Sequence, residues 1–376
     1  MSAWPGKYVI GLTGNIATGK SVIRKMLEHL GAYGIDADAL SHRAIAKEAP
    51  GFQSVVDTFG TWVLGADGQI DRAKLGRLVF SDAEALATLE SIVHPLVRQA
   101  VDILVRRSRQ KIIVIEAIKL LESPLRQACD ALWVSYAPPE VQLMRLVKKR
   151  GMSIDAARQR VRAQASQEEK VAAANVVIRN DGTFENAWSQ VSAAWQSQFA
   201  LEGDTEPIVT ARQGEMMVEK ARPRQAGEIA HFVNRISGGH LNMDVENIME
   251  AFGEKAFIFL KVDRKPVGLV GWQVENLVAR TDDVYLEASL PLKDAMKAIL
   301  EEVETASRDL QCEVSLLFLP AHLARHDAVW RELGYEPRSV QSLGVRAWQE
   351  AAQDTISRGE VMLFKQLRKD RVLKPV

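Results

Sequence analysis

Gly14-Asn15-Ile16-Ala17-Thr18-Gly19-Lys20-Ser21 matches the pattern G-x-x-x-x-G-K-[ST] at every fixed position. The pattern is typical of a loop whose backbone N–H groups surround phosphate oxygens, because its glycines let the chain turn inward. The bare pattern arises by chance in roughly one or two of every hundred chains this long, so its neighbours decide its meaning.

The residues on either side of the loop have the order that such a site requires. Residues 8–12 form a short apolar run that predicts a buried strand. Residues 21–30 follow the loop and predict a helix, because four apolar side chains share one helical face: Val22, Met26, Leu27 and Leu30. Strand, glycine loop and helix together predict a binding site for a nucleoside triphosphate.

Two side chains of the motif have direct chemical roles in such a site. Lys20 is expected to reach the terminal phosphates, and the Ser21 hydroxyl is the expected ligand of Mg²⁺. The backbone and side chains expected to contact the nucleotide here are those of Gly14, Asn15, Ile16, Ala17, Thr18, Gly19, Lys20, Ser21 and Val22.

Two carboxylates follow the first predicted helix. Residues 32–38 read as a second strand, and the spacing of Asp36 and Asp38 points both to one side of an extended segment. Polar groups at the carboxyl end of such a strand meet ligands in open α/β sheets. We expect one carboxylate to accept the proton of an attacking hydroxyl and the other to position it or the metal. The alternative is that both cap the helix that follows.

Further strands and helices complete the first part of the chain. Residues 112–116, 131–136 and 174–178 read as buried parallel strands between helical stretches, which predicts a doubly wound parallel α/β sheet. Glu116 ends one of these strands and is therefore expected near the nucleotide. Residues 139–170 predict a helical lid whose arginines, Arg145 among them, close over the phosphates.

His94 precedes Pro95 within a helical region rich in Leu and Val. Proline disfavours helix in the residue before it, so this is an unusual local choice. A kink with a partly buried imidazole and a functional histidine are equally good interpretations.

Composition excludes several classes of protein. The formal net charge is zero, and neither half has the basic excess expected of a nucleic-acid binder. No apolar run approaches the roughly 20 residues of a membrane-spanning helix. The two cysteines cannot form a disulfide framework or a zinc site, so we expect a cytoplasmic protein in a reducing compartment.

Several short motifs, in order, resemble the dephospho-coenzyme A (dephospho-CoA) kinase family. They run from residue 7 to about residue 200, and besides the glycine loop they include Ile35-Asp36-Ala37-Asp38, Phe59-Gly60, His94-Pro95-Leu96 and Val176-Val177-Ile178-Arg179-Asn180-Asp181-Gly182. The stretch after the predicted strand 112–116 departs from the family pattern, which leaves open whether Glu116 or Glu122 faces the substrate.

The resemblance implies transfer of the γ-phosphate of Mg·ATP to the ribose 3′-hydroxyl of dephospho-CoA, which gives coenzyme A. It implies that Asp38 is the base for that hydroxyl and that Lys20 acts on the transferred phosphate. It places Asn180 and Gly182 near the adenine, and it implies substrate contacts from Asp36, Asp38, His94 and Glu116. The alternatives are another small-molecule or nucleotide P-loop kinase, or a nucleotide-binding scaffold whose second domain binds acyl-CoA or a partner.

Two domains are predicted: a P-loop kinase domain over residues 1–204 and a second α/β domain with a mixed sheet over residues 215–376. Residues 205–214, which include Gly and Pro, read as the linker. We expect a chain that ends near Glu206 to fold and to keep kinase activity.

The second domain resembles the acyl-CoA-dependent N-acetyltransferase (GNAT) family in Val267-Gly268-Leu269-Val270-Gly271 and in Trp330-Arg331-Glu332-Leu333-Gly334-Tyr335-Glu336-Pro337. That family's glycine-containing pyrophosphate loop is missing, because residues 288–294 contain no glycine. The domain is therefore expected to be non-catalytic, and it could still bind coenzyme A or acyl-CoA.

Overall fold

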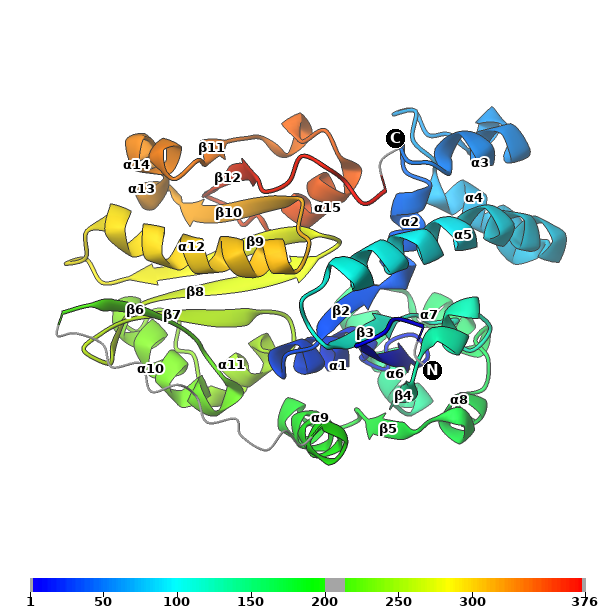
Figure 1. Cartoon of the computed structure of the whole chain (residues 1–376), viewed down its shortest axis with the longest axis horizontal. Helices are drawn as coiled ribbons and strands as arrows, with labels where there is room; N and C mark the ends of the chain where they lie inside the picture. The colour runs from blue at the N-terminus through cyan, green and yellow to red at the C-terminus, as the bar shows by residue number, and fades with distance from the viewer. Residues whose placement is uncertain (1–2, 200–213, 374–376) are drawn as a thin grey trace.

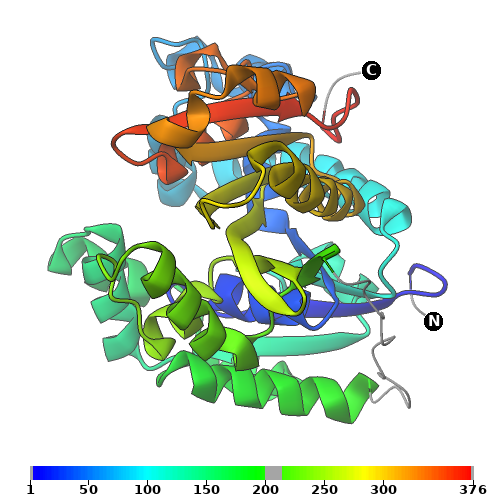
Figure 2. The ribbon, with the colours of Figure 1, turned by 90° about the vertical axis from the view of Figure 1, so that its left-hand side faces the viewer.

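The computed structural model describes residues 3–199 and 214–373 of the chain. The predicted linker, residues 205–214, lies outside these residues except for Gly214. Figures 1 and 2 show two parts packed side by side, each built around its own β-sheet.

Five parallel strands form the sheet of the first part, in the order β2-β3-β1-β4-β5. Their bounds are β1 Tyr8–Thr13, β2 Tyr33–Asp36, β3 Ile112–Glu116, β4 Ala131–Tyr136 and β5 Val176–Arg179. Successive side chains of a strand point to opposite faces, so an apolar run places apolar groups on both faces.

Helices cover both faces of this sheet. One face carries α1 (Lys20–His29) and α9 (Phe184–Phe199), and the other carries α2 (Ala37–Ala44) and α5 (Ala83–Arg107). This arrangement confirms the predicted doubly wound sheet.

Two groups of shorter helices extend from the first part. One group packs with α5 around a small apolar core and comprises α3 Phe52–Phe59, η1 Thr61–Val63 and α4 Arg72–Ser81. The other is the predicted helical lid and comprises α6 Pro139–Arg150, α7 Ile154–Arg162 and α8 Gln167–Ala173. A 3₁₀ turn, η2 Pro124–Ala128, precedes β4.

Seven strands form the second sheet, in the order β11-β12-β10-β9-β8-β7-β6. Their bounds are β6 Met216–Lys220, β7 Ala256–Val262, β8 Lys265–Glu275, β9 Val278–Leu286, β10 Val314–Pro320, β11 Glu336–Pro337 and β12 Glu360–Gln366. Strands β9 and β10 run parallel and the other neighbouring pairs run antiparallel, so the sheet is mixed as predicted.

Helix α12 (Leu292–Asp309) covers one face of this sheet. The opposite face carries α10 (Ala226–Ile236) and α11 (Val245–Ala251) near β7 and β8, and α15 (Arg346–Thr355) near β9, β10 and β12. The remaining short turns are η3 Pro223–Gln225, α13 Ala321–Ala324, α14 Asp327–Glu332 and η4 Val340–Ser342.

Buried side chains join the two parts. Arg43 of α2 donates to Glu313 across the boundary at 2.5 Å, and the Glu313 side chain is 1% exposed. The Nζ of Lys25 donates to the carbonyl of Val274 at 2.6 Å. Leu277 and Leu373 belong to the apolar core between the first sheet and α5. The second part is therefore packed into the core of the first.

The structure differs from the predictions at several elements. Strand β2 ends at Asp36, whose carboxylate caps α2 by accepting the N–H of Ala39 at 2.8 Å. Asp38 consequently lies in the first turn of a helix, so the prediction of an extended segment through Asp38 was wrong.

Helices α11 and α15 were not predicted from the sequence. Within the two described ranges, no helix combines the length and apolar character needed to cross a membrane.

Candidate functional site

The glycine loop between β1 and α1 folds as its sequence requires. Gly14 and Gly19 have φ angles of 150° and 92°, which residues that carry a Cβ rarely adopt. A Cβ on Gly14 would collide with Ser135, and one on Gly19 would collide with the amide of Asn180. The Thr18 hydroxyl holds the turn closed through a 2.8 Å hydrogen bond to the carbonyl of Asn15. The loop thus presents backbone to whatever occupies its centre.

Lys20 is the first residue of α1 and is 7% exposed. Its Nζ lies 3.3 Å from the carbonyl oxygen of Asn15. Burial lowers the pKa of this ammonium, while the nearby carboxylates of Glu116 and Asp38 act in the opposite direction. A buried ammonium beside an open loop is poised to interact with an anion.

Ser21 begins a chain of polar contacts across the base of the site. Its hydroxyl donates to Glu116 at 3.0 Å, and the other oxygen of Glu116 accepts from Arg24 at 2.8 Å. Arg24 also pairs with Glu28 at 2.5 Å. Although burial acts against its charge, these two carboxylates raise the pKa of Arg24, which therefore keeps Glu116 paired beside Ser21.

Asp36 and Asp38 line one cavity, and both interact electrostatically with Lys20. Burial raises the pKa of Asp36 to about 6, and the negative charge of Glu116 adds to the shift. Asp38 accepts the backbone N–H of Ile118 at 3.0 Å, and burial raises its pKa as well. Asp36 is therefore anchored as a helix cap, whereas Asp38 projects from the first turn of α2 near Lys20.

The lid is fastened to the loop by hydrogen bonds. Arg145 of α6 donates to the carbonyls of Ala17 at 3.1 Å and Asn180 at 2.8 Å, and Asn180 donates to that of Thr18 at 2.9 Å. Gln164 accepts the backbone N–H of Ile16 at 2.7 Å. A cationic group is thereby held over the loop.

Comparison with known proteins agrees with this geometry. The family model for dephospho-CoA kinase matches residues 8–186. The dephospho-CoA kinase of Carboxydothermus hydrogenoformans is 43% identical over 193 residues, which cover 49% of this chain and 90% of that protein. The enzyme of Geobacter sulfurreducens is 39% identical over 194 residues, which cover 51% of this chain and 98% of that protein. This chain belongs to the dephospho-CoA kinase family. Its first part is thus an ATP-dependent kinase of coenzyme A synthesis.

A crystal structure of a GNAT-family acetyltransferase from Staphylococcus aureus covers 41% of this chain and 100% of its own length. The sequence identity is 13% and the TM-score is 0.33.

One cavity lies at the glycine loop, and two others lie at the aspartates. The largest, about 660 Å³, is lined by Gly19, Lys20, Ser21, Arg145, Asn180 and Gly182, and also by residues of α11. Val22 lines it too. The predicted nucleotide-binding residues Gly14, Asn15, Ile16 and Thr18 lie in the same loop, where Asn15 and Ile16 bond the lid.

A second cavity, about 320 Å³, lies between α2, α4 and α5 and is lined by Asp38, His42 and His94. The helix α5 continues through Pro95, and His94 is exposed toward this cavity. Of the two interpretations of His94, the partly buried imidazole does not fit the structure, which brings His94 into one cavity with Asp38.

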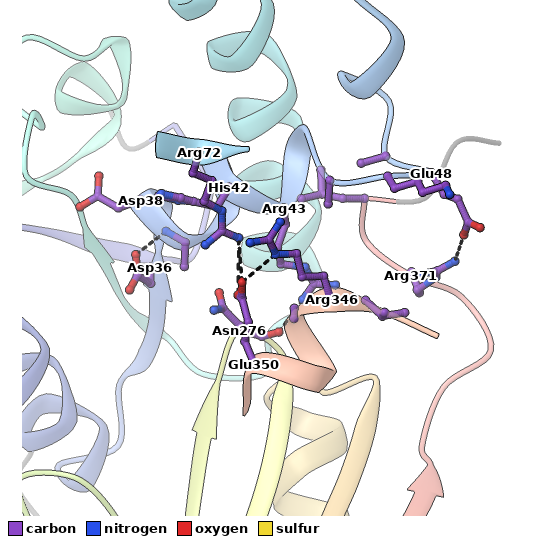
Figure 3. A pocket seen from close by; sticks show the side chains of 17 residues that line it. Asp36, Asp38, His42, Arg43, Glu48, Arg72, Asn276, Arg346, Glu350 and Arg371 are labelled. Atoms are coloured by element: carbon purple, nitrogen blue, oxygen red, sulfur yellow. Dashed lines mark hydrogen bonds and ion pairs between the residues drawn. The ribbon is translucent and has the colours of Figure 1, made fainter. Parts of the chain in front are cut away.

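The third cavity, about 260 Å³, lies where the two parts meet, and Asp36 and Asp38 line its kinase side (Figure 3). Arg72 of α4 and Arg346 of α15 converge on Glu350, at 3.4 Å and 2.9 Å. Burial lowers the pKa of His42 to about 4, and the charge of Arg72 adds to this effect. A charged cavity built from both parts thus adjoins Asp38.

The sequence did not decide whether Glu116 or Glu122 faces the substrate, and the structure places these two residues in different environments. Glu116 is buried beside Ser21, whereas Glu122 is exposed. Sequence reasoning did not identify Gln164 and Arg24 as parts of the site. Of these two residues, only Gln164 lies in a short motif that resembles the dephospho-CoA kinase family, Ala163-Gln164-Ala165.

The donors next to the loop suit Mg²⁺. Among the described residues, no group of three or more His, Cys, Asp or Glu side chains could hold a metal ion. Mg²⁺ in kinases takes only one or two protein oxygens and completes its shell with phosphates and water. The Ser21 hydroxyl with Glu116 at 3.0 Å offers such a set.

Proposed function

We propose that the first part transfers the γ-phosphate of ATP to the ribose 3′-hydroxyl of dephospho-CoA, with Asp38 as the general base and Lys20 on the transferred phosphate. The observation that carries the proposal is the position of Asp38. It lines the two smaller cavities, which adjoin α2, and lies close enough to the buried Lys20 for their charges to interact.

The residues divide the work by their chemistry. The loop and the N-terminus of α1 bind phosphate oxygens through backbone N–H groups. Lys20 and Arg145 neutralise charge that develops on the transferred group, as phosphoryl transfer requires. Asp38 orients the acceptor hydroxyl and takes its proton, and its raised pKa suits a base better than that of an exposed aspartate.

Ser21 and Glu116 would hold Mg²⁺, which would screen the β- and γ-phosphate charges when bound. We therefore reassign Glu116 from the acceptor to the metal side of the site. His94 and Asp36 stay with the acceptor, because His94 shares a cavity with Asp38 and Asp36 borders the adjoining one.

ADP release by the full chain tests the proposal. With Mg·ATP, addition of dephospho-CoA should raise the rate well above that of ATP alone. Lys20→Ala should abolish the increase, whereas Lys297→Ala, at a lysine 58% exposed on α12, should not.

No stimulation by dephospho-CoA would contradict the assignment. Stimulation by nucleoside monophosphates in its place would indicate another P-loop kinase. ATP binding without turnover on any acceptor would favour a nucleotide-binding scaffold.

A further inference from the structure

The large cavity beside the glycine loop has walls from both parts of the chain. The first part supplies Lys20, Arg145 and Phe184, and the second part supplies the exposed side of α11. Its volume of about 660 Å³ lies within the range of sites that enclose a small ligand. Figure 1 shows α11 next to α1 and α9, the helices that frame this cavity.

Specific contacts hold α11 in this position. The Nε2–H of His29 in α1 donates to the carbonyl of Phe252 at 2.8 Å, and the two rings pack edge to face at 5.5 Å. A Cβ on Gly253 would lie 3.3 Å from both Phe184 and Val22, so only a small residue permits this approach. The end of α11 is therefore locked against the kinase residues that border the cavity.

The chemistry along the cavity sets the direction in which a nucleotide lies. Phosphates belong at the loop, where backbone N–H groups and Lys20 converge. The remaining volume lies between the segment Gly182–Glu185 and α11. A nucleotide whose phosphates occupy the loop must direct its ribose and base into this volume.

The side of α11 that lines the cavity suits a nucleoside. It offers the apolar side chains of Val245, 49% exposed, and Met249, 7% exposed. It also offers the carboxylates of Glu246 and Glu250. Carboxylates repel phosphate but accept hydrogen bonds from ribose hydroxyls and from an exocyclic amino group. Basic residues of the lid helix line the same cavity: Arg145, Lys149 and Arg150.

We propose that α11 of the second part is the wall of the ATP site that contacts the nucleoside. The proposal rests on the proposed function, because it requires the triphosphate to occupy the glycine loop. Val245 and Met249 pack against the base, and Glu250 accepts a hydrogen bond from the nucleoside. The second part thereby sets the affinity of the kinase for ATP, although the glycine loop is more than two hundred residues away in the sequence.

The test compares two ligands that share phosphates but differ in the nucleoside. Binding of ATP and of inorganic triphosphate, each with Mg²⁺, is measured by calorimetry on the full chain. The double variant Val245→Ala with Glu250→Ala should raise the Kd for ATP about threefold to tenfold, the size expected for one lost hydrogen bond and one lost apolar contact. Triphosphate should bind no more weakly than to the wild type.

Both substituted residues are exposed, so the fold should tolerate the change, and the melting temperature checks this. Glu301→Ala is the matched control, since Glu301 is 69% exposed on α12, which packs on the opposite face of the second sheet from α11. Unchanged ATP binding, or an equal loss for both ligands, would overturn the proposal.

Lys20→Ala separates this result from a failure of the proposed function. If it weakens both ligands while the α11 variant weakens neither, the loop binds phosphate and only the α11 wall is wrong. If it weakens neither ligand, the nucleotide site itself is misplaced and both proposals fail.

Discussion

Two strand-to-helix turns of this chain look alike in topology and differ in chemistry. Residues 14–19 join β1 to α1, and residues 287–291 join β9 to α12. The first turn has positive φ at Gly14 and Gly19, whereas none of residues 287–291 does. The N-cap of α12 is Pro291, which has no N–H to donate. A strand followed by a helix thus becomes an anion site only where the backbone can turn its N–H groups inward.

The two parts also differ in whether their buried charges face a cavity or are paired with an opposite charge. In the kinase part, Lys20 and Asp38 face cavities. In the second part, Glu313 is paired with Arg43, and Glu304 is paired with Lys365 at 2.5 Å. Lys20 and Asp38 thus stay available to ligands, whereas these paired charges satisfy one another.

Of the substitutions considered, loss of the charge of Glu313 is expected to have the largest effect, and this effect is on stability. Glu313→Gln leaves the buried Arg43 without its counter-ion, which should lower the free energy of unfolding by about 3 kcal/mol or more. Urea denaturation measures the change. The control Glu301→Gln, in an exposed pair with Lys297 at 4.0 Å, should change it by about 0–1 kcal/mol. Equal effects would mean that the buried charges of the second part are not structural.

A substitution at Asp38 tests whether a buried charge that faces a cavity takes part in the reaction. Asp38→Asn should lower kcat about a hundredfold and leave the KM for ATP near that of the wild type. Asp57→Asn, at an aspartate that pairs with Gln53 on the surface, should leave both unchanged. Near-normal kcat in Asp38→Asn would exclude the base role, and a collapse of ATP binding would instead indicate a metal-site role.

A substitution at Gly19 tests whether ATP binding needs the backbone conformation of the turn at residues 14–19. Gly19→Ala forces a Cβ toward the amide of Asn180 and strains a φ of 92°, so the Kd for ATP should rise about tenfold or more. Gly344→Ala is the matched control, because a Cβ there meets no atom within 4 Å. Calorimetry with ATP measures both. Unaltered affinity in Gly19→Ala would show that the close backbone approach is not needed.

From the turn at residues 287–291 we predict that the second part does not transfer acetyl groups to amines. Acetyl-CoA should be consumed no faster with a panel of amines than without them, since the turn before α12 lacks the conformation that surrounds a pyrophosphate. Thiol release by the full chain measures this rate. Amine-dependent release would remove the contrast between the two turns, whereas binding of coenzyme A alone would be compatible with it.

The predictions from the sequence succeeded where the information is local and failed where it is not. The loop, its strand and its helix follow from contiguous residues and were predicted. The segment through Asp38 was misinterpreted as extended because an aspartate near a helix start can end a strand or belong to the helix, and spacing alone does not separate these. The expectation that the kinase part works alone stays a prediction, and the proposed role of α11 argues against it, because that helix lines the proposed ATP site.

The sequence by itself determined the parallel sheet, the glycine loop that begins α1, the family to which the first part belongs, and the absence of a second glycine loop. Each depends on residue types at short, fixed separations, which restrict backbone geometry directly. Only the tertiary structure decided that Arg43 meets Glu313, that His94 shares a cavity with Asp38, and that α11 borders the cavity at the glycine loop. Such contacts depend on how two separately patterned sheets pack together, and no periodicity within either segment encodes that packing.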